Sequence, residues 1–119
     1  SEEVSQWLQD AQAGELPPAQ PMAGFVRYAF TYAFYYLYRA TPFQKAILET
    51  LVRGGDTDTN ACIVGGLIGA LHGMDGIPKS AIDKVLTCDT SHGQERPSAY
   101  TIKPVLGHLK MLSQHCLGE

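Results

Sequence analysis

Charged side chains are scarce in this 119-residue chain, which has 18% Asp, Glu, Lys and Arg against 45% hydrophobic residues. Soluble domains average about 25% charged residues. The net charge is −3, and the 9 basic residues are scattered and form no cluster. This balance argues against a nucleic-acid or anionic-membrane surface. It also indicates that more of the chain is covered than a free-standing small domain could manage.

Cysteines and long apolar runs are few as well. The three cysteines, Cys62, Cys88 and Cys116, form no Cys-x-x-Cys pair, so we expect reduced thiols that pack as small core hydrophobes. The longest uncharged apolar run, Ala61–Leu71, is far shorter than the ~20 residues that span a bilayer. The polar, acidic segment Ser1–Gly14 is unlike a signal peptide. These features predict a soluble, cytoplasmic protein.

Helical periodicity is present along most of the chain, and no segment has the pattern of a strand. We therefore predict an all-α fold, an orthogonal helical bundle within a single segment of residues 1–119. Residues 1–23 would form an amphipathic helix and a proline-rich linker, residues 24–100 a central region, and residues 101–119 a C-terminal helix. The predicted helices are Glu2–Ala13, Gly24–Tyr38, a helix capped by Thr41 that ends near Arg53, Asn60–His72, Ile77–Thr87, and a last helix from Thr101 that Pro104 interrupts.

Two of the predicted helices, Gly24–Tyr38 and Asn60–His72, are apolar on nearly every side. Such helices are buried all round, and a domain of this size has room for about one of them. The second helix also carries glycines at positions 65, 66, 69 and 73. Because glycine costs up to ~1 kcal/mol inside a helix, we expect them to permit the close approach of another backbone.

The candidate chemistry lies in the run Gly54-Gly55-Asp56-Thr57-Asp58-Thr59. Its two carboxylates and the hydroxyl of Thr59 are hard oxygen ligands of the kind that Mg²⁺, Mn²⁺ and Ca²⁺ prefer. The alternative is helix capping, in which Asp58 or Thr57 accepts the first amides of the helix and the helix dipole favours Asp56. The residue chemistry by itself leaves both interpretations open.

Two other motifs can be tested against the same run. An EF-hand loop that starts at Asp56 requires glycine at its sixth position and glutamate at its twelfth, where the chain has Ala61 and Leu67. The run Asp56–Asn60 also resembles the Asp-x-Asp-x-Thr loop of haloacid-dehalogenase-like phosphatases. In that family the loop follows a buried strand, whereas here the preceding segment is predicted to be helical. Neither motif accounts for the run.

A longer string is more specific: Gly55-Asp56-Thr57-Asp58-Thr59-Asn60-Ala61, Gly65, Gly69-Ala70, Gly73, Ile77-Pro78 and Arg96-Pro97. Together with the two preceding helices, it resembles the C-terminal part of the ADP-ribosylglycohydrolase family, over roughly Gly24 to Tyr100. The resemblance implies part of a larger all-helical fold with two divalent cations, Mg²⁺ or Mn²⁺, at the base of a cleft for ADP-ribose. It assigns Asp56, Asp58 and Thr59 to the C-terminal ligands of that site.

The resemblance also implies a reaction, the hydrolysis that frees ADP-ribose from a modified side chain such as arginine or serine. The family's Thr-Asp-Asp ligand triplet and a glutamate in a comparable setting are missing from these 119 residues. We therefore expect the chain alone to be inactive and to require the N-terminal half or a second chain, and we assign no catalytic residue. His92 and Tyr100 could line the substrate cleft. Two alternatives stay open, a non-catalytic, crystallin-like family member and a small stand-alone metal-binding module.

Overall fold

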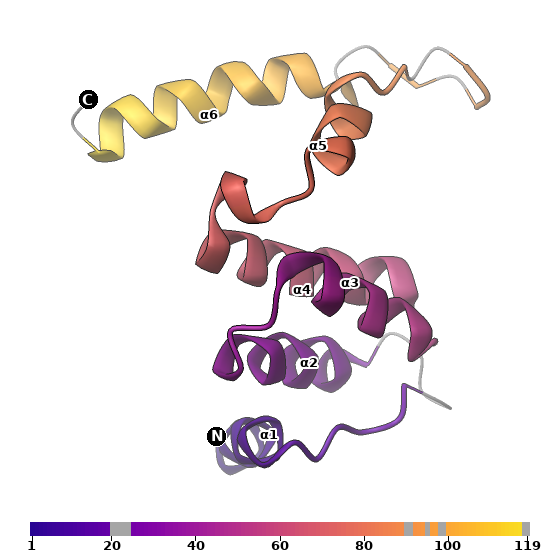
Figure 1. Ribbon diagram of the computed structural model, residues 1–119, viewed down its shortest axis with the longest axis vertical. Helices are drawn as coiled ribbons and strands as arrows, with labels where there is room; N and C mark the ends of the chain where they lie inside the picture. The colour runs from indigo at the N-terminus through magenta and orange to yellow at the C-terminus, as the bar shows by residue number, and fades with distance from the viewer. Residues whose placement is uncertain (20–24, 90–91, 95, 98–99, 118–119) are drawn as a thin grey trace. The chain divides into compact units, whose positions relative to one another are not determined.

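The computed structural model describes residues 1–19, 25–89, 92–94, 96–97 and 100–117, and within these residues it contains helices and no strand (Figure 1). The all-α prediction is confirmed. In chain order the elements are α1 (Glu2–Ala13), α2 (Val26–Tyr38), α3 (Phe43–Val52), α4 (Thr57–His72), the 3₁₀-helix η1 (Met74–Gly76), α5 (Lys79–Leu86) and α6 (Ile102–Leu117). The chain divides into two compact units, Ser1–Ile77 and Pro78–Glu119, and each is described by itself.

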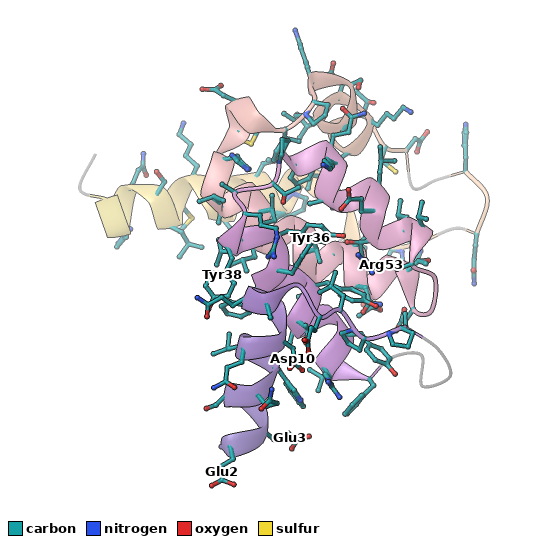
Figure 2. The ribbon with its side chains drawn as sticks, turned by 60° about the horizontal axis from the view of Figure 1, so that its bottom comes forward. Glu2, Glu3, Asp10, Tyr36, Tyr38 and Arg53 are labelled. Atoms are coloured by element: carbon teal, nitrogen blue, oxygen red, sulfur yellow. The ribbon has the colours of Figure 1, made fainter. Side chains whose placement is uncertain are left out.

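Helix α1 packs on α2 through one aromatic and one ionic contact. The ring centroid of Trp7 lies 5.8 Å from that of Phe30, in an edge-to-face arrangement that aromatic pairs favour. Asp10 is buried on α1 (Figure 2). Its carboxylate accepts a hydrogen bond from the Arg27 guanidinium at 2.9 Å. Arg39, just after α2, donates to the carbonyl oxygen of Ala11 at 3.2 Å, where the end of α1 leaves carbonyls without helical partners.

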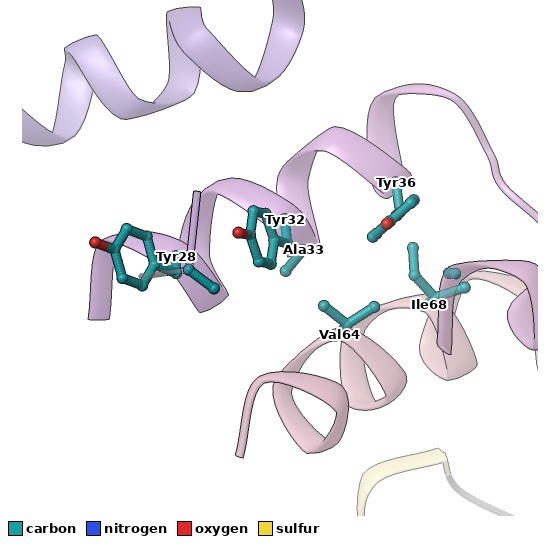
Figure 3. Packing of buried hydrophobic residues seen from close by; sticks show 8 residues of the cluster. Tyr28, Tyr32, Ala33, Tyr36, Val64 and Ile68 are labelled. Atoms are coloured by element: carbon teal, nitrogen blue, oxygen red, sulfur yellow. The ribbon is translucent and has the colours of Figure 1, made fainter. Parts of the chain in front are cut away.

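The core of the first unit lies between α2 and α4. Tyr28, Tyr32 and Tyr36 recur every four residues and therefore lie along one side of α2. Figure 3 shows this side above the labelled α4 residues Val64 and Ile68, which are fully buried. The aromatic run therefore forms a helix because its residues at this spacing build a single packed face.

Helix α3 packs on a neighbouring face of α4, against its small residues. A Cβ atom added to Gly65 would lie 3.1 Å from Cδ1 of Ile47, and one added to Gly69 would lie 3.6 Å from Cε2 of Phe43. Among the described residues, Gly65 and Gly69 thus face side chains, mainly those of α3, and not another backbone. The approach of a backbone from outside this chain stays a prediction. Gly66 has no atom of the described residues within 4 Å of its added Cβ.

Three predicted helix boundaries require correction. Thr41 does not cap α3: its N–H donates to the carbonyl oxygen of Tyr36 at 3.0 Å, so it belongs to the end of α2, and Pro42 precedes α3 instead. Helix α4 begins at Thr57 and not at Asn60. Pro104 does not interrupt α6, because it is the third residue of that helix, where no N–H is needed.

Each of the two apolar helices has cover on only part of its surface. Val26 and Tyr38 of α2 are exposed, and so are Ile63 and Leu71 of α4. The prediction for the cysteines is wrong for the two that the structure describes: Cys62 and Cys88 are both exposed, the first on an uncovered part of α4. None of the described helices is long and apolar enough to cross a membrane.

Candidate metal centre

The Asp56–Thr59 run lies where α3 turns into α4. Helix α3 ends at Val52, with Arg53 as its C-cap. Gly54 and Gly55 then adopt φ angles of +76° and +71°, which residues with a side chain rarely reach. Asp56 is the residue that precedes α4. Its carbonyl oxygen accepts the N–H of Asn60 at 3.0 Å, the first hydrogen bond of the helical ladder. The motif residues after Asp56 therefore form the first helical turn, where the dipole favours negative charge.

The structure brings the carboxyl groups of Asp56 and Asp58 together, within hydrogen-bonding reach of each other. This contact is the main reason why the pKa of Asp58 lies below its ordinary value; the backbone N–H groups of Thr59 and Asp58 lower the same pKa further. Asp58 is fully exposed to solvent. These contacts favour its ionised form, so Asp58 stays charged to a lower pH than an ordinary aspartate.

The capping alternative applies to only one of the two carboxyls. Although Asp56 occupies the N-cap position of α4, its side chain makes no capping hydrogen bond. Asp58 acts as a cap instead, since its carboxylate accepts hydrogen bonds from the backbone N–H groups of Asp58 and Thr59 in the first turn. The carboxylate of Asp56 is thus left without a role in holding the helix.

The donor set suits one side of a hard cation. Asp56 is half-buried, whereas Asp58 and Thr59 are exposed, so an ion can reach all three side chains. In the described part of the chain, no three His, Cys, Asp or Glu side chains gather in a way that could hold a metal ion. Two carboxylates and a hydroxyl are consistent with Mg²⁺ or Mn²⁺ only when further oxygens come from elsewhere.

Residues around the Gly54-Gly55 turn that the sequence analysis did not single out hold it in place. A Cβ atom added to Gly55 would lie 2.7 Å from the carbonyl oxygen of Ala19, so the segment after α1 lies directly on this turn. Burial raises the pKa of Tyr36, and the neighbouring Arg53 and Thr50 oppose that rise. In the sequence, only the position of Arg53 directly before Gly54 indicated that its side chain could help to hold this turn.

The two residues predicted to line a substrate cleft, His92 and Tyr100, both belong to the second unit. The ring of His92 is exposed and lies 3.9 Å from the carboxylate of Asp89. Tyr100 lines a hollow of about 310 Å³ together with Gln94, Arg96 and Pro97. Because this unit is described by itself, a role of either residue at the Asp56 site stays a prediction.

The known proteins that match the chain all belong to one family. The sequence profile of the family described as ADP-ribosylglycohydrolase matches residues 1–102. The chain is 42% identical over 79 residues to the protein L543 of Acanthamoeba polyphaga mimivirus, which is named as an ADP-ribosyl glycohydrolase; the match covers 66% of the chain and 23% of that protein. No solved structure matches.

Two further relatives match over shorter stretches. The ADP-ribosyl-[dinitrogen reductase] glycohydrolase of Rhodospirillum rubrum is 33% identical over 51 residues, which cover 43% of the chain and 17% of that protein. The ADP-ribosylhydrolase ARH3 of Danio rerio is 49% identical over 37 residues, which cover 31% and 10%. The aligned part of the chain therefore spans less than a quarter of the length of the curated relatives it matches.

Proposed function

This chain belongs to the ADP-ribosylglycohydrolase family, and we propose that Asp56, Asp58 and Thr59 form one part of its divalent-cation site. The observation that carries this proposal is the pair of adjacent carboxyls, of which Asp56 makes no capping contact. A cation between them would be attracted by both carboxylates and could use the oxygens of Asp56, which make no capping hydrogen bond. Solvent exposure of Asp58 and Thr59 leaves the approach open.

The complete site requires more than this chain offers. Mg²⁺ takes six oxygens in near-octahedral geometry, and with one oxygen from each, the three side chains supply half of that number. We infer that the remaining ligands of the two Mg²⁺ or Mn²⁺ ions come from the rest of the family's domain, either upstream or on a second chain. Two observations support this inference: the chain spans at most 23% of its relatives, and apolar side chains of α3 and α4, such as Val52 and Ile63, lie uncovered.

The proposed reaction is hydrolysis of the bond between ADP-ribose and a modified side chain, such as arginine or serine. When bound, the cations supply Lewis-acid chemistry and lower the pKa of a coordinated water. The part of this chain is to hold and orient a cation: Asp56 and Asp58 contribute negative charge, and Thr59 contributes a neutral oxygen. The start of α4 fixes the spacing of all three groups.

Titration of Mn²⁺ into the whole chain tests the ligand assignment. We expect weak binding that Asp56→Asn abolishes, because this substitution keeps the shape of the side chain and removes its charge. The matched control is Asp75→Asn in η1, which removes the same charge from an exposed turn of the same unit and should leave the affinity unchanged. Equal binding by all three proteins, or none by the wild type, would overturn the proposal.

A further inference from the structure

Tyr32 of α2 lies at the point where the segment after α1 meets the turn before Asp56. Its side chain is fully buried, and its hydroxyl donates to the carbonyl oxygen of Pro17 at 2.6 Å. The residues around Pro17 are not helical, so this carbonyl has no helical ladder to join. A backbone oxygen in a partly buried position favours a protein donor, and Tyr32 supplies it. This bond anchors the segment 16–19 to α2.

The anchored segment in turn touches the turn that presents Asp56. Ala19 is buried and lies two residues beyond Pro17. A Cβ atom on Gly55 would lie 2.7 Å from the Ala19 carbonyl oxygen and 2.8 Å from its Cβ. The space between Gly55 and Ala19 therefore has no room even for a methyl group, so the two backbone segments are closely packed. Gly55 directly precedes Asp56, so the placement of Ala19 bears on the first candidate ligand.

Tyr32 also reaches the other end of the same turn. The guanidinium carbon of Arg53 lies 5.2 Å from the centroid of the Tyr32 ring, within the range of a cation–π contact. Arg53 directly follows α3 and directly precedes the two glycines. The turn Gly54-Gly55 is therefore held at Arg53 by the ring of Tyr32, and at Gly55 by the segment that the hydroxyl of Tyr32 anchors.

We propose that Tyr32 is a positioning residue for the Asp56–Thr59 cation site, an inference that rests on the proposed function. Two consecutive glycines at positive φ would otherwise leave Asp56 free to sample many positions. A turn ordered before the ion arrives loses less entropy on binding. Tyr32 acts through Ala19 and Arg53 and itself touches neither ligand nor ion.

The matched pair Tyr32→Phe and Tyr28→Phe tests this role. Each variant loses one hydroxyl from the same side of α2, but only the Tyr32 hydroxyl is bonded to Pro17. We expect Tyr32→Phe to weaken Mn²⁺ binding by about three- to tenfold, the range of one neutral hydrogen bond. In the metal-free chain, amide exchange of Gly55 and Asp56 should become faster. Tyr28→Phe should change neither quantity.

A second pair keeps the proposal testable if Tyr32→Phe fails to fold. Gly54→Ala and Gly55→Ala both place a side chain at positive φ, but only the second meets Ala19; the first points into open space. We expect the larger loss of Mn²⁺ affinity from Gly55→Ala. Wild-type affinity and exchange in Tyr32→Phe, or equal losses in both glycine variants, would overturn the inference while the ligand assignment stands. Absence of binding to the wild type would overturn the proposed function as well.

Discussion

The carboxyl of Asp58 has two tasks at the start of α4. It accepts the first-turn amides and faces Asp56, and these contacts lower its pKa. A group whose pKa is depressed on folding stabilises the protein above its unfolded pKa, and this contribution is lost as the pH falls through the folded value. Because Asp58 is fully exposed, solvent screens the effect, and the contribution should be small.

The pH dependence of unfolding measures this contribution. In urea titrations, the wild type should be slightly more stable than Asp58→Asn at pH values above the unfolded aspartate pKa of about 4. The difference should shrink as the pH falls below that value, because Asp58 becomes protonated and loses its advantage over the amide. A difference that grows on acidification would contradict the assigned direction of the pKa shift.

Helix α4 combines two kinds of glycine that a sequence does not distinguish. Gly65 faces Ile47 of α3, where the packing leaves little room for a methyl group. Gly66 is exposed, and no described atom lies near its added Cβ. Within this chain, packing accounts for the first glycine and not for the second.

Alanine substitutions separate the two positions. Gly66→Ala should raise the free energy of unfolding by up to about 1 kcal/mol, because alanine favours a helix and meets no neighbour here. Gly65→Ala should raise the free energy of unfolding by less, or lower it, since Cδ1 of Ile47, 3.1 Å from the new Cβ, has to shift. Chemical denaturation of both variants gives the comparison. A larger increase in the free energy of unfolding from Gly65→Ala than from Gly66→Ala would show that α3 does not pack against Gly65 as described.

For the chain as a whole, the uncovered apolar side chains and the incomplete donor set have the same explanation. Hydrophobic residues of α3 and α4 are exposed although the chain has few charges. Under the proposed function, the rest of the family's domain would cover these side chains. The short coverage of the relatives fits this view, since most of the family's length lies outside the aligned part.

An activity assay with the isolated chain tests whether the chain requires the rest of the family's domain. Supplied with millimolar Mg²⁺ and an arginine or serine peptide that carries ADP-ribose, the chain alone should release no ADP-ribose, because three side chains cannot complete a two-cation site. Free ADP-ribose can be followed by chromatography, with Asp56→Asn as the control. Turnover by the wild type that this substitution removes would mean that the 119 residues suffice.

The sequence by itself determined the helices and the candidate ligands. The apolar periodicity of α1 and α2 predicted helices, and the run from Gly54 to Thr59 indicated the ligands. Both predictions rest on local patterns, because helix formation and ligand chemistry depend on near neighbours in the chain. The sequence also led to the family, through the same run and the small residues of α4. Local rules failed where a position depends on distant contacts, as for the exposed Cys62.

Only the tertiary structure decided how the candidate site is held. Tyr32 is one aromatic residue among many in α2, and its spacing predicts burial and nothing more. Its bond to Pro17, the contact of Ala19 with Gly55 and the position of Arg53 over its ring join residues from separate parts of the chain. Such contacts arise from the packing of whole helices, which local propensity does not encode. For the same reason, the freedom of the Asp56 carboxyl from capping could be read only from the folded helix start.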